Sequence, residues 1–287
     1  MEDFFDYNYF EPDYFEPPER DEYAENAMAA IEEVIATQRV VTDRELKVRL
    51  EDKFFPWVTG RALASMVERG QIVKIGLPGR RRRRVTKDFY TLPDFDYDDI
   101  VGEMQEKRSV STEVNAMLTG HAPATFFAED LFERAFNSLG FEIVARDASE
   151  YKGRKVIAVK GKEPPNLDFI LERDRVVYGV DVKNWIRYEY NTRDEVIFKV
   201  GLALQLQIVP FIIARYVDKD AIYTEIILKG GICYPYKTLL FSPSFVSLAR
   251  RANSLLGYPT IALDRLPPFK VERIDFLHKK ILAKRKG

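Results

Sequence analysis

Apolar residues recur at helical spacing between residues 24 and 70 and predict three helices. Thr42 followed by Glu45 makes a capping box for the second helix, which we expect to end near residue 52. The third helix begins near Pro56, a residue suited to a first helical turn, and ends at Gly70. The first helix, over residues 24–38, has five apolar residues on one face: Ala27, Met28, Ile31, Val34 and Ile35.

The pattern then changes to short runs that are typical of strands. Residues 71–76 and 80–90 flank a Leu77-Pro-Gly turn and predict a β-hairpin. An acidic connector follows over residues 93–122, with a helix expected over 98–118. From Pro123 onward, helical and strand patterns alternate, which predicts an α/β domain. We expect helices over 124–139 and 193–207, strands over 142–146, 155–159, 168–172, 176–183, 210–216 and 221–228, and a terminal helical region.

Composition narrows the classes of protein. The 287 residues leave room for about two domains of ~150 residues each. Cys233 is the single cysteine, which excludes an intramolecular disulfide and a zinc or iron–sulfur site made of cysteines. The apolar runs fall short of the ~20 residues of a membrane span, and Glu2 and Asp3 do not resemble the start of a signal sequence. We therefore expect a cytoplasmic protein, nucleoid-associated in a prokaryote, with no membrane partner.

The charge is distributed unevenly although the whole chain carries only −1. Residues 1–23 hold nine acids and one base together with eight aromatic residues. Such an acidic aromatic arm is either a docking segment or a disordered tail. Residues 24–92 hold nine acids and fourteen bases, and residues 270–287 hold two acids and seven bases. Basic segments of this kind suit an anionic partner.

Two expected strands carry a candidate site. Asp168 and Asp181 are the only acids inside the apolar runs 166–171 and 176–183, which the charged turn 172–175 would join as a hairpin. Side chains two apart on a strand share a face, so Asp181 and Lys183 should emerge together, and hairpin pairing can bring Asp168 beside them. A divalent cation and a phosphate would satisfy two carboxylates and an ammonium, whereas an ordinary surface salt bridge is the alternative interpretation.

With these residues the chain resembles the PD-(D/E)XK nuclease superfamily, including archaeal Holliday junction resolvases and restriction-endonuclease-like proteins. The resemblance covers residues 123–240. It rests on Glu129 in a helix that ends at Gly140-Phe141, on Asp168, and on the Asp181-Val-Lys183 strand end. Pro164 and Pro165 stand two residues further from Asp168 than the motif's proline usually does, and Glu133 is an alternative to Glu129.

The resemblance implies an α/β fold with a restriction-endonuclease-like mixed sheet flanked by helices, and an Mg²⁺-dependent endonuclease in which Mn²⁺ substitutes. Asp168, Asp181 and the backbone carbonyl of Val182 would bind the metal. Glu129 would hold a second metal or a metal-bound water, and Lys183 would orient the attacking water and stabilise charge on the phosphate.

The helical segment and hairpin before this region resemble a winged helix. By this resemblance the third helix enters the major groove, with Arg61 and Ser65 toward the DNA and Leu63, Met66 and Val67 toward the core. The hairpin would contact the DNA backbone or minor groove. Its expected DNA-binding residues are basic: Lys74, Arg80, Arg81, Arg82, Arg83, Arg84 and Lys87.

The leading hypothesis is thus a DNA endonuclease, acting as a homodimer, whose parts are an arm (1–23), a winged helix (24–92), a helical linker (93–122) and a nuclease domain with a basic tail (123–287). Restriction-like cutting and cutting of branched or repair DNA both remain open. The alternatives are a noncatalytic DNA-binding protein that keeps the nuclease fold, and a transcription regulator whose C-terminal part mediates dimerisation.

Overall fold

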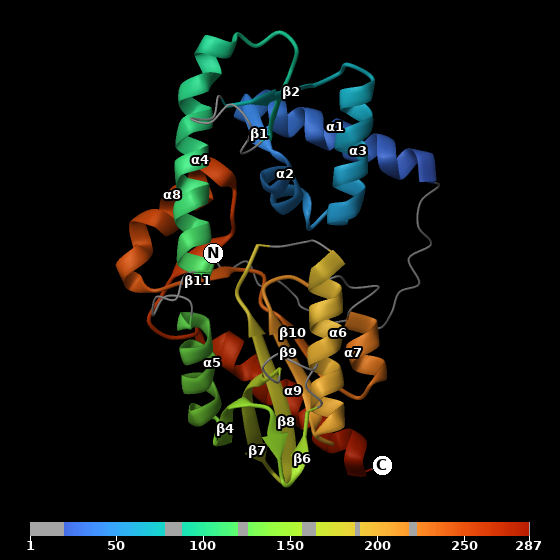
Figure 1. Cartoon of the computed structure of the whole chain (residues 1–287), viewed down its shortest axis with the longest axis vertical. Helices are drawn as coiled ribbons and strands as arrows, with labels where there is room; N and C mark the ends of the chain where they lie inside the picture. The colour runs from blue at the N-terminus through green and yellow to red at the C-terminus, as the bar shows by residue number, and fades with distance from the viewer. Residues whose placement is uncertain are drawn as a thin grey trace. The chain divides into compact units, whose positions relative to one another are not determined.

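The computed structural model describes residues 20–77, 88–119, 126–156, 165–186, 190–217 and 223–286 (Figure 1). The chain divides into two compact units, Met1–Ile100 and Val101–Gly287. Within the described ranges, no helix combines the length and the apolar character that crossing a membrane requires.

Three helices form the core of the N-terminal unit, as the apolar spacing predicts. They are α1 (Arg20–Gln38), α2 (Asp43–Leu50) and α3 (Pro56–Glu68). Thr42 caps α2, since its hydroxyl oxygen accepts a hydrogen bond from the Glu45 backbone N–H at 3.1 Å. Apolar side chains of all three helices share one buried cluster, which includes Ile31, Leu46 and Met66.

A small antiparallel sheet completes this unit. Its order is β1-β3-β2, with β1 (Val40–Thr42), β2 (Val73–Gly76) and β3 (Asp88–Thr91). The predicted hairpin is confirmed at β2 and β3, whereas residues 78–87 lie outside the described ranges. Strand β1 was not predicted. It is three residues long, too short for a periodic pattern, and it forms by pairing with β3.

Five strands of the C-terminal unit form one mixed sheet in the described part of the chain. The order is β10-β9-β8-β7-β4. Strands β4, β7 and β8 pair antiparallel, and β8, β9 and β10 pair parallel. The strands are β4 (Glu142–Ala148), β7 (Leu167–Arg173), β8 (Val176–Lys183), β9 (Val209–Ala214) and β10 (Ile232–Pro235).

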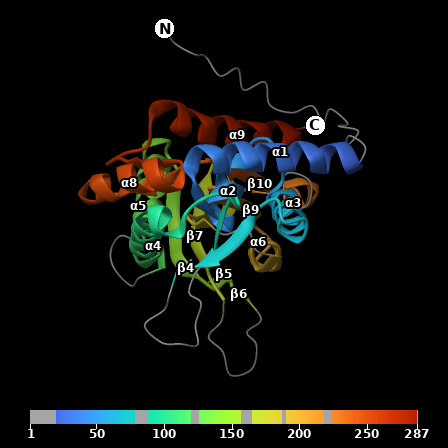
Figure 2. The same ribbon diagram turned by 90° about the horizontal axis from the view of Figure 1, so that it is seen from above.

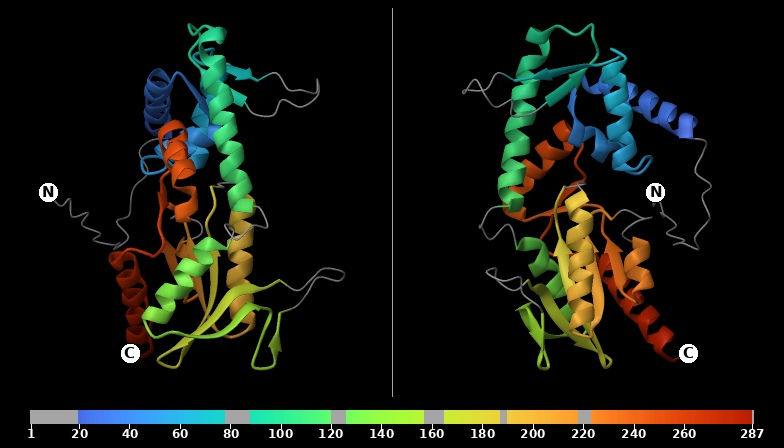
Figure 3. Two further views of the ribbon diagram at one scale, coloured as in Figure 1. Left: turned by 90° about the vertical axis from the view of Figure 1, so that its left-hand side faces the viewer. Right: turned by 45° about the vertical axis from the view of Figure 1, so that its right-hand side comes forward.

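Helices cover both faces of this sheet, which confirms a mixed α/β architecture. Helices α5 (Phe127–Ser138) and α9 (Pro268–Lys286) lie on one face, and α6 (Tyr190–Gln205) lies on the other (Figures 2 and 3). Neighbouring residues of β7 divide accordingly, because Phe169 joins the cluster with α5 and Ile170 joins the cluster with α6. This two-sided burial explains why β7 and β8 are apolar runs without strict alternation.

The prediction of a strand over residues 221–228 is wrong. The described part of this segment is helix α7 (Thr224–Leu228), which ends before Gly230 at φ 75°. Its tyrosine, threonine and isoleucines favour strands on propensity. However, β9 and β10 are parallel neighbours, so the chain must cross between them, and the helix makes this connection with Ile226 buried against β9.

Shorter elements complete the C-terminal unit. The expected helix 98–118 is confirmed as α4 (Tyr97–Thr119), which begins in the N-terminal unit. The strand expected over 155–159 is described only at its start, as β6 (Arg154–Lys155), which pairs with β5 (Glu150–Tyr151). The terminal region holds β11 (Leu239–Phe241), η2 (Pro243–Phe245), α8 (Val246–Leu256) and β12 (Thr260–Ala262) before α9.

A chain of polar contacts, buried at Tyr178 and His278 and exposed at Asp174, connects α9 with the β7–β8 turn. The Tyr178 hydroxyl lies 2.7 Å from His278 Nδ1, and His278 Nε2 lies 2.9 Å from Asp174 Oδ2. His278 is fully buried, so its imidazole ring is part of the interior of this unit. The hydrogen bond from His278 lowers the pKa of Asp174.

Candidate active site

Strand pairing brings the two predicted aspartates together. The β7–β8 register pairs Phe169 with Val180, so the next step places Asp168 opposite Asp181. The Val182 backbone N–H donates to Asp168 Oδ2 at 2.6 Å. The structure therefore shows Val182 positioning Asp168 through its N–H group, whereas the expected role of its carbonyl as a metal ligand stays a prediction.

Asp181 is fully buried and is surrounded by positive charge. Lys183 Nζ lies 3.0 Å from Asp181 Oδ1, to which it donates, and 2.9 Å from Oδ2. Two hydrogen bonds hold the backbone carbonyl of Lys183. It accepts one from the Arg215 backbone N–H at 3.0 Å and one from the Tyr236 hydroxyl at 3.1 Å. The strand end that carries the acid and the lysine is thus rigidly held.

A second lysine, not predicted from the sequence, completes the surroundings of Asp181. Lys199 Nζ on α6 lies 3.0 Å from Asp181 Oδ1 and also donates to the backbone carbonyl of Asn166. The sequence did hold a signal for it. Lys199 shares helical spacing with Val196, Val200 and Ala203, all buried, so a lysine occupies the apolar face of the helix.

Glu129 lies in the first turn of α5, and the charges of Asp168, Asp181 and Lys183 affect the pKa of its carboxyl. Burial raises the pKa of its carboxyl to about 8, and the negative charge of Asp168 adds to the effect while Lys183 opposes it. Burial and the charge of Asp181 also raise the pKa of Asp168. Glu133, the alternative helix acid, forms an ion pair with Arg146 instead. Of the two glutamates, Glu129 is the one that is electrostatically part of the aspartate cluster.

The donor set suits a hard divalent cation with few protein ligands. Among the described residues, no three Asp, Glu, His or Cys side chains converge as a ligand group. Asp181 Oδ2 is nevertheless buried and accepts no hydrogen bond from any described group, although Lys183 Nζ lies near it. Mg²⁺ is commonly held by one or two carboxylates, with waters and substrate phosphate as further ligands. Asp168 and Asp181 fit that pattern.

Helix α3 of the N-terminal unit exposes an aromatic and cationic surface. Trp57 is 47% exposed, stacks on Phe55 with 6.2 Å between ring centroids, and lies beneath the Arg61 guanidinium at 5.0 Å. Trp57 was not among the predicted residues. The sequence nevertheless places it one helical turn before Arg61, so that the two side chains lie on the same face of the helix. Ser65 is partly buried on the same helix.

The inward side of α3 agrees with the prediction, since Leu63 and Met66 are buried and Val67 is partly buried. Lys74 on β2 forms an ion pair with Asp88 on β3 at 2.7 Å, and this hydrogen bond raises the pKa of Lys74. The remaining predicted DNA-binding residues lie outside the described residues: Arg80, Arg81, Arg82, Arg83, Arg84 and Lys87.

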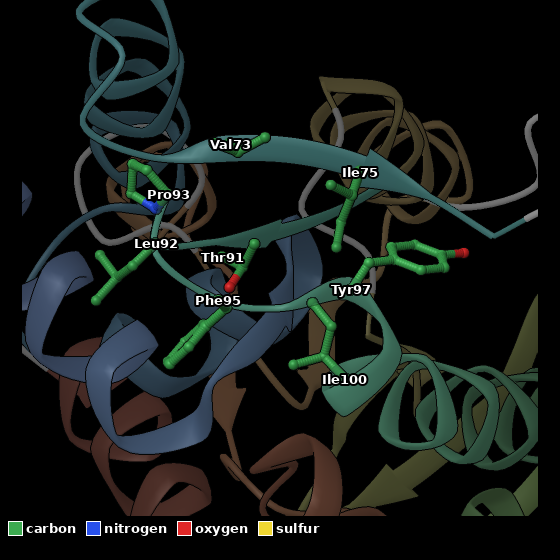
Figure 4. A pocket seen from close by; sticks show the side chains of 8 residues that line it. All are labelled: Val73, Ile75, Thr91, Leu92, Pro93, Phe95, Tyr97 and Ile100. Atoms are coloured by element: carbon green, nitrogen blue, oxygen red, sulfur yellow. The ribbon is translucent and has the colours of Figure 1, made fainter.

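A small pocket of the N-terminal unit has a different character. It lies between β2, β3 and the start of α4, and its walls are mainly apolar, including Val73, Ile75, Phe95 and Ile100 (Figure 4). The Thr91 hydroxyl at this pocket already donates to the Arg39 carbonyl at 2.8 Å. The pocket therefore lacks the acids and bases that hydrolysis needs, and the aspartate cluster of the C-terminal unit remains the candidate active site.

The chain matches no protein-family model, no curated protein and no solved structure.

Proposed function

We propose that the chain is a metal-dependent endonuclease that hydrolyses phosphodiester bonds of DNA. The observation that carries the proposal is the cluster of Asp168, Asp181 and Lys183 at one end of the β7–β8 hairpin. The two carboxylates lie close together on a buried strand end, and burial and the charge of Asp181 raise the pKa of Asp168, which shows that its ionised form is disfavoured there. A divalent cation together with a phosphate supplies the complementary charges.

Asp168 and Asp181 would hold the cation, which when bound neutralises phosphate charge and lowers the pKa of water. Lys183 would position the attacking water and stabilise negative charge on the phosphate. Glu129 would hold a second metal or a metal-bound water, and because its pKa of about 8 keeps the carboxyl mostly protonated near neutral pH, binding of the cation would have to displace that proton. In the reaction, the water oxygen bonds to phosphorus, the bond from phosphorus to one sugar oxygen breaks, and that oxygen takes up a proton.

The element order supports the finer description of the fold. The antiparallel meander β4–β7–β8, followed by α6 and the parallel strand β9, is the arrangement expected of a restriction-endonuclease-like core. The three helices and the β1-β3-β2 sheet of the other unit are similarly what a winged helix requires. In the proposal, this winged helix positions DNA through α3 and its hairpin.

The remaining features of the proposal follow from the substrate. Cutting both strands of a duplex suits a homodimer with one site per copy. Mg²⁺ is the expected cofactor, with Mn²⁺ as a substitute because it also prefers oxygen ligands. DNA as the partner places the enzyme in the cytoplasm or nucleoid.

Cleavage assays with Asp181→Asn test the proposal. Wild type should cut at least one of single-stranded, duplex, flap or four-way DNA with Mg²⁺ or Mn²⁺ and not with chelator. Asp181→Asn should lower the rate by about 10²-fold or more, since it removes a ligand charge used in the transition state. Glu150→Gln is the matched control, because Glu150 is an exposed acid of β5 whose carboxylate forms an ion pair with the exposed Lys155.

Equal cutting by wild type and Asp181→Asn would contradict the proposal. One observation favours a second candidate, a noncatalytic DNA-binding protein that retains this fold. Lys183 and Lys199 both lie within 3.0 Å of Asp181, so its charge is already balanced by the protein. DNA binding by wild type without cutting under any metal would support that candidate.

A further inference from the structure

Two lysines share one buried carboxylate in the candidate site, and only one is accounted for by the proposed chemistry. Lys183 follows Asp181 on the same strand face. Lys199 lies on helix α6 rather than on the strand that carries Asp181. Only 11% of its side chain is exposed, and its Nζ lies 3.0 Å from Asp181 Oδ1. An ammonium at that distance from a carboxylate oxygen occupies space and supplies charge that a bound cation would otherwise provide.

The position of Lys199 is set by the packing of α6. Val196 and Val200 on either side of it are buried against β9 and α7 residues. One turn further, Ala203 packs directly on β8, where a Cβ added at Gly179 would lie 3.0 Å from Ala203 Cβ. Because this packing holds the helix close to the sheet, we expect Asp181 to be released by a change of the Lys199 side-chain rotamer, which would also break the lysine's hydrogen bond to the Asn166 carbonyl.

The charge balance of the cluster also favours movement of one lysine away from Asp181 when a cation binds. Asp168 and Asp181 bring two negative charges, and Lys183 and Lys199 bring two positive charges, so these four side chains are neutral without a metal. A divalent cation added to all four would leave a net positive cluster in a partly buried place, which is unfavourable. Movement of one ammonium away from Asp181 relieves this excess.

We propose that Lys199 is an internal counter-ion of Asp181 that competes with the divalent cation and moves off the carboxylate when the cation binds. This inference rests on the proposed function, because it assigns the cation to Asp181. Lys199 is in these terms a residue that sets metal affinity, distinct from Lys183, which acts on water and phosphate. After the cation binds, the Lys199 ammonium would be available to contact a substrate phosphate.

The test is Mn²⁺ binding by the full-length chain without DNA, with free Mn²⁺ measured by electron paramagnetic resonance. Lys199→Met and Lys199→Gln remove the competing charge and should tighten binding by about tenfold. Lys199→Arg keeps the charge and should bind as wild type does. Lys229→Met is the matched control, since it removes the lysine at the C-cap of α7, whose ion pair with Glu225 at 3.7 Å is partly exposed.

A second measurement needs no substitution. The rate at which a water-soluble acylating reagent modifies Lys199, followed by mass spectrometry of its peptide, should rise when Mn²⁺ is added to wild type. Lys155, which is largely exposed, is the reference and should react at the same rate with and without Mn²⁺. No rise at Lys199 would overturn the proposal even if the Lys199 variants failed to fold.

The outcomes separate this inference from the function on which it rests. Unchanged or weaker Mn²⁺ binding by Lys199→Met and Lys199→Gln overturns the counter-ion role. If wild type still cuts DNA and Asp181→Asn does not, the nuclease proposal stands. If no variant and no wild-type sample binds Mn²⁺, the counter-ion role fails, and absence of cutting in the same samples removes the nuclease proposal as well.

Discussion

Glu129 is an acid whose protonation depends strongly on the folded structure. Burial and the nearby charge of Asp168 raise its pKa to about 8 from an ordinary value of 4.5. Between these two pH values, the folded chain holds a proton that the unfolded chain has lost. Raising the pH through this window therefore removes stability, because the folded state must give up a proton that it binds more tightly.

This leads to a prediction about stability in chelator. The free energy of unfolding should fall from pH 5 to pH 8, and Glu129→Gln should make the decline shallower. The difference in slope is at most about 1.4 kcal/mol per pH unit for one proton, and smaller because Glu129 is partly exposed. Denaturant titrations of both proteins at each pH measure it, and parallel slopes would show that Glu129 does not titrate as described.

The site residues that could be predicted from the sequence are those that lie on two strands paired as a hairpin. Asp168, Asp181 and Lys183 lie on one hairpin, so strand periodicity and a short turn are enough to bring them together. The contact of Lys199 with Asp181 instead depends on how far α6 is rotated and how closely it lies on β8. That geometry arises from tertiary packing, which the pattern of a single segment does not specify.

At the scale of elements, the close approach of α6 to β8 depends on one glycine. A Cβ at Gly179 would lie 2.7 Å from Leu167 Cδ1 and 3.0 Å from both Ala203 Cβ and Ile208 Cδ1. No rearrangement of one flexible side chain relieves all three contacts. The absence of a side chain at this position thus sets the distance between the helix and the strand that carries Asp181.

Gly179→Ala should therefore destabilise the chain by about 1–3 kcal/mol, the usual cost of overpacking a core. Gly201→Ala is the matched control, because Gly201 lies within α6 and an added Cβ there meets nothing within 4 Å. That substitution should be neutral or stabilising by up to about 1 kcal/mol through helix propensity. Equal effects of the two changes, measured by urea unfolding, would argue against close packing at Gly179.

Long periodic elements were predicted well and short ones were not. The spacing of Ala27, Ile31 and Ile35 defined α1, which begins four residues before the expected start at residue 24. Strand β1 and helix α7 each have five residues or fewer, so local propensity gives little information about them. Their conformations are decided by pairing with β3 and by the crossover to β10.

At the scale of the whole molecule, the near-neutral net charge conceals an uneven distribution of charge along the chain. The basic segment 24–92 belongs to the unit with the exposed Trp57–Arg61 surface, and the aspartate cluster belongs to the other unit. A DNA enzyme needs both a cationic surface for phosphates and anionic ligands for its metal. Opposite charges on different parts of the chain then cancel in the total.

The arginine run gives a prediction at this scale. Changing residues Arg80 to Arg84 together to alanine should weaken duplex binding in chelator and flatten its salt dependence. The slope of log affinity against log salt should fall by about 0.9 for each arginine that contacts a phosphate. Fluorescence anisotropy of labelled DNA measures this slope, and a five-lysine variant, which keeps the charge, should retain it. If the five-alanine variant had the same salt dependence as wild type, the arginine run would not contact the DNA phosphates.

Among the strands that the structure describes, β4 forms an outer edge of the main sheet, which has consequences for aggregation. It carries a bulge between Ile143 and Ala145, and its exposed positions include Glu142, Arg146 and Asp147. Asp147 also adopts a left-handed backbone with φ 45°, which turns the strand end away from a straight ladder. Bulges and charges at an edge hinder the addition of a strand from another molecule. Two copies of this chain should therefore associate through other surfaces, and the hairpin that holds Asp168 is shielded from recruitment into an intermolecular sheet.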